Sequence, residues 1–521
     1  MSCSVSLIDK LPRKAATFAM TAVAAALLSA CGTVQVQPLS VDAVQKQAAS
    51  DRQAAFANVP PVAGKLTMDE AIARALKYNL DRRTRLMEEA LAMNQLDTAN
   101  LDMLPRLVAN AGYTWRDQDL ITRSVDSVTG LPSLANPYIS SERSHAAYDL
   151  GLTWNMLDFG MSYLTAKQTA DRVMIASERR RKAMHVLIAD VRTAFWRTAS
   201  AQKLRNDVKL TIAMAEAALE DARKVESERL RSPVDSLRYQ RQLLENLRLL
   251  ESIEQDLIGG RVELASLINS PIEQPLEVAE PGENLQSALL DLPVTRMEEL
   301  AVAQNADLRE QFYNARISVE ETRKTMLRMF PNLSFNYDFR YDTDKYLINN
   351  HWNDAGLHLS WNVMNLLSAP AQKRLAEAGV KLADQRRVAA QMSVLTQAHL
   401  ARLQYQTAYR QYLRADQIWQ ADAKIAEHVR NRQQVEAQSK LELVANNTTA
   451  ILSLLRRYQS LAQLQGAASK MQATMGMEPR LGSVDQLTLD QLTQAIGASM
   501  REWEASPAPA AAPAAAPAAA K

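Results

Sequence analysis

The sequence is poor in the residues that end helices. Only 15 of its 521 residues are glycine and 19 are proline, and the stretch 161–231 contains neither. Long segments without these breakers are typical of long helices rather than of several independent globular domains. At about 1.5 Å per residue, a helix of roughly 70 residues would extend about 105 Å. The composition therefore predicts rod-like helices.

Long apolar runs are also absent. After residue 40, no apolar stretch approaches the roughly 20 residues that a transmembrane helix needs. If this chain crosses a membrane, strands must do so. The charges nearly balance, with 60 Lys and Arg against 58 Asp and Glu. This balance argues against nucleic acid as a partner, because nucleic-acid-binding surfaces gather basic residues.

Cysteine is nearly absent, with only Cys3 and Cys31. A basic start followed by a small apolar segment predicts a secretory signal peptide at 1–30. Its end, Leu28-Ser29-Ala30-Cys31, resembles the lipobox of bacterial lipoproteins. That resemblance implies that the signal is removed together with Cys3 and that Cys31 is lipidated. An ordinary signal peptide with a chance cysteine is the alternative.

The residue after Cys31 is Gly32, not the aspartate that retains such lipoproteins in the inner membrane. The resemblance therefore implies a lipid-anchored protein of the cell outer membrane, because several acyl chains together make a stable anchor. Residues 31–64 have little periodicity. We expect them to form an extended, lipidated N-terminal linker.

The chain contains an internal repeat, which is its most informative feature. Residues 79–83 (Asn-Leu-Asp-Arg-Arg) are matched 226 positions later by 305–309 (Asn-Ala-Asp-Leu-Arg). The stretch 154–269 matches 361–476 with no change of length. Packed helices require such constant length, because one inserted residue rotates an apolar stripe by about 100°. The length difference between the repeats lies between residues 105 and 154, where a loop tolerates it.

Each repeat contains two amphipathic strands after its first helix. Residues 332–342 alternate strictly between apolar and polar, and 106–116, 145–156 and 352–363 do so less cleanly. Four strands of about ten residues with one apolar face suit a transmembrane β-barrel, although a soluble sheet packed on helices is the alternative. Four strands cannot close a barrel, and open edges cannot face lipid, so several chains would have to pool their strands.

Each strand pair leads into a long helix, a tight turn and a second helix with apolar residues at coiled-coil spacing. The turns lie at about 228–238 and 436–446. The expected organisation is a signal peptide (1–30), a linker (31–64), a first repeat (65–270), an equatorial linker (271–296), a second repeat (297–476), an equatorial C-terminal segment (477–504) and an Ala/Pro-rich disordered tail (505–521).

This order of elements resembles the TolC-type outer-membrane efflux proteins over residues 66–476. The carrying motifs are Asn305-Ala306-Asp307-Leu308-Arg309, Trp154 to Gly160, Val234-Asp235-Ser236-Leu237 and Leu441-Glu442-Leu443-Val444. The resemblance implies an α+β membrane protein whose homotrimer builds a twelve-stranded β-barrel and a long periplasmic barrel of coiled-coil helices. It also implies a periplasmic adaptor and an inner-membrane transporter as partners, with the hairpin tips as a closed entrance.

Two acidic residues are the candidate gate residues at these tips, Glu442 and Asp235. Glu442 matches a position at which the family often has an acid that rings the pore, and three carboxylates near one axis would attract cations. The alternative is an acid favoured by the dipole of a helix N-terminus, and this applies even more to Asp235. Ala445 stands where the family can have a second aspartate, which is a departure from the family's pattern.

No enzyme motif is found. The six histidines are scattered, and phosphate-binding loops, nucleophile elbows and paired cysteines are missing. We therefore expect no catalytic residues, no metal and no cofactor. The leading hypothesis is a passive outer-membrane duct in an efflux or export system. A type I secretion-like or polysaccharide export duct, or a structural periplasmic coiled-coil lipoprotein without a pore, is the alternative.

Overall fold

The computed structural model describes residues 38–123, 125–131, 138–228, 232–280, 287–434, 440–479, 481–482 and 484–505. The chain forms two compact units, residues 1–58 and 59–521. In the first unit, helix α2 (Val41–Phe56) begins at Ser40, whose hydroxyl oxygen accepts a hydrogen bond from the backbone N–H of Ala43. The expectation of an extended linker is therefore wrong for this segment. Its residues all remain out of any core, because α2 buries none of them.

The second unit repeats one order of elements, two helices, two strands and a long helical hairpin. The first copy consists of α3 (Met68–Tyr78), α4 (Leu80–Leu101), β1 (Arg106–Trp115), β4 (Ser144–Asn155), α5 (Met156–Ser227) and α6 (Pro233–Leu267). The second consists of α7 (Val294–Gln304), α8 (Ala306–Leu327), β5 (Asn332–Asp342), β6 (His351–Ser360), α9 (Asn365–Gln434) and α10 (Lys440–Thr474). A 3₁₀ turn, η1 (Ser287–Leu290), precedes α7, and α11 (Leu489–Ala505) follows the second copy.

Local sequence explains where these helices begin. Thr67 caps α3 by accepting a hydrogen bond from the N–H of Glu70, and Pro233 occupies the first position of α6. Proline is favoured there because its missing N–H would have no partner in the helix. The segment between β1 and β4, which we expect to be a loop, also contains a short ribbon of β2 (Ile121–Thr122) and β3 (Tyr138–Ile139).

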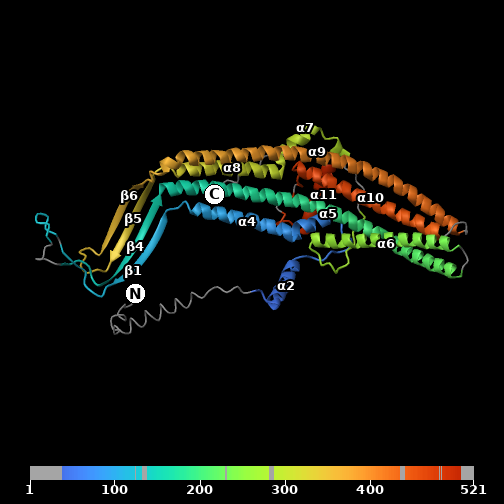
Figure 1. Cartoon of the computed structure of the whole chain (residues 1–521), viewed down its shortest axis with the longest axis horizontal. Helices are drawn as coiled ribbons and strands as arrows, with labels where there is room; N and C mark the ends of the chain where they lie inside the picture. The colour runs from blue at the N-terminus through green and yellow to red at the C-terminus, as the bar shows by residue number, and fades with distance from the viewer. Residues whose placement is uncertain are drawn as a thin grey trace. The chain divides into compact units, whose positions relative to one another are not determined.

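The four main strands form one antiparallel sheet in the order β1-β4-β5-β6. The adjoining helices follow the same order, because α4 contacts α5, α5 contacts α8 and α8 contacts α9. Farther along, α5 pairs with α6 and α9 with α10, and α10 contacts α5. Within this unit, the strands lie at one end of the long helices, and the end of α5 and the starts of α6 and α10 lie at the other (Figure 1).

The main hydrophobic core lies where the two copies meet at mid-length. It gathers buried side chains of α3, α5, α7, α9, α10 and α11, among them Phe195, Tyr405 and Met297. Two smaller clusters continue along α5 and α6 with residues of α10. Among the described residues, no helix has an apolar stretch long enough to cross a membrane.

Candidate functional site

The four-stranded sheet exposes its apolar face. On β5, Leu333, Phe335, Tyr337, Phe339 and Tyr341 are all exposed, whereas the alternate polar residues of the same strand, apart from Arg340, are half-buried. The register carries the apolar face onto β4 and β6, since Leu333 lies opposite Leu359 and Phe339 opposite Leu150. In a water-soluble sheet the apolar face would be covered. This inverted arrangement is the one that a lipid environment favours.

Among the residues that the structure describes, both edges of the sheet are unpaired. β1 and β6 each pair with one strand of the chain, and α4 and α9 border the matching helical layer. Every residue of β1 is exposed. An unpaired strand edge presents a row of N–H and C=O groups that seek another strand. The edges at β1 and β6 are therefore available to pair with further strands.

The loops beyond the strands are tied together by charged residues. Arg143 donates to both carboxylate oxygens of Asp119, at 2.6 and 2.5 Å, and Lys345 lies 2.9 Å from Glu142. The carboxylate of Asp344 accepts hydrogen bonds from the backbone N–H groups of Glu142 and Tyr346. Although burial raises the pKa of Asp344, these hydrogen bonds hold it below its ordinary value. The longer loop of the first repeat is thus anchored on the shorter loop of the second.

The two candidate gate residues begin the second helix of each hairpin. Asp235 is in the first turn of α6, with its carboxylate 3.9 Å from Arg238, and Glu442 is in the first turn of α10. Both side chains are exposed. The turns themselves lie partly outside the described residues, which exclude 229–231 and 435–439. Both positions fit an acid beside a helix N-terminus, since each follows the start of its helix by two residues.

The start of α10 is packed against the first hairpin. Val444, which is only 1% exposed, belongs to a cluster with Ala218 of α5 and Leu243 of α6. Since Val444 is two residues from Glu442, the position of that acid depends on this apolar contact. The contact is one that sequence reasoning did not identify, because it joins the two copies of the repeat.

Asparagine motifs hold the middle of the unit together. The side-chain oxygen of Asn305 caps α8 at the N–H of Leu308, and its amide donates 3.0 Å to the carbonyl of Thr474 at the end of α10. Asn79 does the same in the first copy, with Arg82 and with Leu267 at the end of α6. The asparagine of the repeated Asn-x-Asp motif therefore joins the start of α4 to the end of α6 in the first copy and the start of α8 to the end of α10 in the second.

Charged groups surround this junction. Arg309 lies 2.8 Å from the buried carboxylate of Glu178, which also accepts from Arg181 at 2.5 Å. Arg181 also contacts Glu478, whose pKa is raised because the carboxyl group is buried. His185 lies in the same cluster, and burial, with a smaller contribution from the charge of Arg181, lowers its pKa to about 4. The imidazole is consequently neutral at physiological pH.

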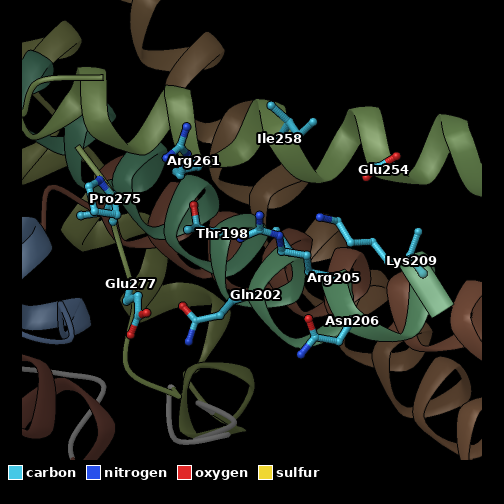
Figure 2. A pocket seen from close by; sticks show the side chains of 13 residues that line it. Thr198, Gln202, Arg205, Asn206, Lys209, Glu254, Ile258, Arg261, Pro275 and Glu277 are labelled. Carbon is cyan, nitrogen blue, oxygen red and sulfur yellow. The ribbon is translucent and has the colours of Figure 1, made fainter. Parts of the chain in front are cut away.

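A hollow of about 580 Å³ lies between α5, α6 and residues 275–277 (Figure 2). Three basic and two acidic side chains line it: Arg205, Lys209, Arg261, Glu254 and Glu277. This mixed charge favours no single class of ligand. Beside the hollow, the side chain of Gln202 exchanges two hydrogen bonds with the backbone of Val278, at 3.2 and 2.9 Å. The linker between the repeats is thereby fixed across α5.

The proposed lipidation residue, Cys31, lies outside the described residues, as do 506–521 of the tail. Within the described part of the chain, no group of three or more histidine, cysteine or acidic residues is arranged to hold a metal ion.

Several solved structures share this fold. The CmeC outer-membrane channel of Campylobacter jejuni superimposes with a TM-score of 0.61 at 12% identity, over 83% of this chain and 89% of that one. The VceC outer-membrane protein of Vibrio cholerae matches with a TM-score of 0.58 at 12% identity, over 79% and 97%. The MtrE outer-membrane channel of Neisseria gonorrhoeae, in its open state, gives 0.56 at 15% identity, over 79% and 94%.

No family profile and no curated protein matches the sequence itself. The structural similarity nevertheless extends over about four fifths of the chain. The chain has the fold of the TolC-type outer-membrane channels, an α+β fold of long coiled-coil helices with four strands per protomer.

Proposed function

We propose that this protein is the outer-membrane duct of an efflux or export system. Three copies close their sheets into a twelve-stranded barrel and their helices into a periplasmic tunnel, through which cargo passes without chemical change. Cys31, lipidated after removal of the signal peptide, anchors each copy in the outer membrane. A periplasmic adaptor and an inner-membrane transporter supply cargo and energy at the hairpin end.

The observation that carries this proposal is the inverted sheet with two open edges. An exposed face of Leu, Phe and Tyr on β5 is stable against lipid, and unpaired edges at β1 and β6 require strands from further copies in that environment. A structural lipoprotein without a pore needs neither feature. The fold shared with outer-membrane channels supports the same conclusion.

Glu442 is our candidate for the entrance. Three Glu442 carboxylates close to the tunnel axis repel one another and favour cations over anions. Asp235 occupies the same position of the first hairpin and is the natural control.

Single-channel recording in planar lipid bilayers tests the duct and its entrance. We expect discrete conducting events, with a cation preference that Glu442→Gln reduces and Asp235→Asn changes less. Because a closed entrance would be silent, Val444→Asp is recorded in parallel. This change places a charge in the apolar contact that holds the start of α10 and should loosen the tip. Silence from both the wild type and Val444→Asp would reject the duct, whereas conductance unaffected by Glu442→Gln would reject only the gate.

A further inference from the structure

The polar face of the sheet carries a band of charged residues at one level. The register places Asp149 of β4 opposite Arg340 of β5, and Asp338 of β5 opposite Asp354 of β6. All four side chains lie on the face opposite to the exposed Leu, Phe and Tyr residues, because neighbouring strands present paired residues to the same side. We refer to Asp149, Asp338, Arg340 and Asp354 as the charged band.

Within the charged band, one guanidinium is shared by three carboxylates. Arg340 lies 3.3 Å from Asp354 and 3.9 Å from both Asp149 and Asp338. Each ionised Asp contributes one negative charge and Arg340 one positive charge, so the band of one protomer carries a net charge of about −2. At these separations in a hydrated environment, ion pairs weaken the field of the acids without cancelling it.

Neutral donors hold the three carboxylates in place. Asn110 of β1 donates to Asp149 of β4 at 3.1 Å. Within single strands, Asn336 donates to Asp338 at 2.9 Å and the indole N–H of Trp352 to Asp354 at 3.1 Å. These hydrogen bonds therefore restrict the three carboxylates to positions on the surface of the sheet. A fixed ring of charges gives a pore a defined preference for one sign of ion.

Two glycines make room for this arrangement. A Cβ atom at Gly151 would lie 2.4 Å from Oδ1 of Asp338, and one at Gly356 would lie 2.5 Å from the side-chain oxygen of Asn336. Asp338 can therefore lie flat over the sheet, with its side chain only 14% exposed, while those of Arg340 and Asp354 are 47% and 44% exposed. Arg340 and Asp354 are therefore the most solvent-exposed members of the charged band.

We propose that the charged band sets the charge preference of the duct at the level of the strands, in favour of cations and cationic cargo, and that Arg340 limits this preference. The inference rests on the proposed function, since closure of the sheet turns the polar face towards the lumen. Each further copy then adds the same excess of negative charge around one ring. A narrow passage with low-dielectric walls strengthens the effect of such a ring on passing ions.

The experiment measures the reversal potential of open channels under a KCl gradient, at low ionic strength so that screening is weak. All proteins carry Val444→Asp in α10, which should open the entrance and leaves the residues of the sheet unchanged. Arg340→Gln should raise the cation-to-anion permeability ratio by roughly twofold or more, and Asp354→Asn should lower it. Arg340→Lys should restore the original ratio, which separates the effect of charge from that of altered packing.

The matched control is Arg296→Gln, which removes the same charge from α7, away from the strands. It should leave the reversal potential unchanged. If the channels conduct and neither Arg340→Gln nor Asp354→Asn shifts the reversal potential, the inference is overturned while the duct stands. If no variant conducts, the proposed function itself fails, and the inference fails with it.

Discussion

At the scale of single residues, Gln304 and Asn305, which connect α7 to α8, make three contacts with other elements. Asn305 binds the carbonyl of Thr474, while the carbonyl of Gln304 accepts a hydrogen bond from Arg181 and lies against Gly476. The start of α8 and the end of α10 meet at this point. Small changes here should therefore lower the stability of the whole unit rather than that of one helix.

Gly476 is the most sensitive of these residues. Its φ of +67° lies in the left-handed region, and a Cβ would lie 2.4 Å from the carbonyl oxygen of Gln304. Gly482 has a similar φ of +61°, but nothing lies within 4 Å of its Cβ position. We expect Gly482→Ala to cost about 1 kcal/mol of unfolding free energy through backbone strain, and Gly476→Ala to cost clearly more. Denaturation followed by circular dichroism measures both, and equal losses would show that the close approach to Gln304 is unimportant.

His185 makes the stability of the junction dependent on pH. Its pKa is lowered to about 4, first by burial and then by Arg181, whereas an unfolded histidine titrates near 6.5. The unfolded chain therefore binds the proton first, so this contribution to stability is present above pH 6.5 and is lost as the pH falls towards 4. Between pH 7 and 5 the expected loss is about 2 kcal/mol.

The variant His185→Gln tests this dependence, because glutamine stays neutral throughout. The raised pKa of Glu478 acts in the opposite direction, since the folded protein then holds a proton more readily than the unfolded chain as the pH falls. The comparison of the two proteins therefore isolates the histidine. Wild type should lose more stability than His185→Gln on acidification, and parallel curves would contradict the assignment.

At the scale of elements, α5 and α6 approach each other closely at one glycine. A Cβ at Gly260 would lie 3.0 Å from Cβ of Arg197 and 3.3 Å from its backbone carbon, whereas Gly259 has open space around it. Alanine is favoured over glycine within a helix by about 1 kcal/mol. Gly259→Ala should therefore stabilise the protein by up to that amount, while Gly260→Ala should lose the gain by forcing the helices apart. Denaturation midpoints of the pair decide the matter, and equal gains would rule out close contact at Gly260.

The elements themselves were largely predictable because their signals are local. Strict alternation over 332–342 coincides with β5, and the absence of glycine and proline from 161–231 accompanies α5. The ribbon of β2 and β3 has only two residues per strand, too few for a periodic pattern. The hydrogen bond from Asn305 to Thr474 joins residues far apart in the sequence. Its asparagines were visible as a repeated motif, but their second partner depends on tertiary packing.

The charged band illustrates the same limit. Sequence alternation places Asp338 and Arg340 on one face of one strand, but it does not say which residues of β4 and β6 lie beside them. Only the register brings Asp149 and Asp354 to Arg340, because a shift of one residue would turn them to the other face. Hairpins within one copy could be anticipated, whereas the pairing of β4 with β5 joins the two copies.

At the scale of the whole molecule, the closure that we propose would join copies along the edges of the helical layer, formed by α4 and α9. Along the α9 border, Leu375 and Leu382 are one heptad apart, with 76% and 52% exposure, and Met87 and Leu91 are similarly exposed on α4. Residues seven apart lie on one side of a helix and form the seam of coiled coils. We expect the α9 edge of one copy to pack on the α4 edge of the next, as continuation of the layer order requires.

The double substitution of Leu375→Glu and Leu382→Glu tests this seam. Charges at a buried contact between copies would be costly, so we expect the proposed trimer to dissociate, with the helical content of each protomer retained. Mass measured by light scattering after size-exclusion chromatography reports the assembly, and circular dichroism reports the helices. Val128→Glu, at a 92% exposed loop position, is the control and should leave the mass unchanged. A trimer that persists with both glutamates would place the contact between copies elsewhere, and the strand edges alone would then have to close the duct.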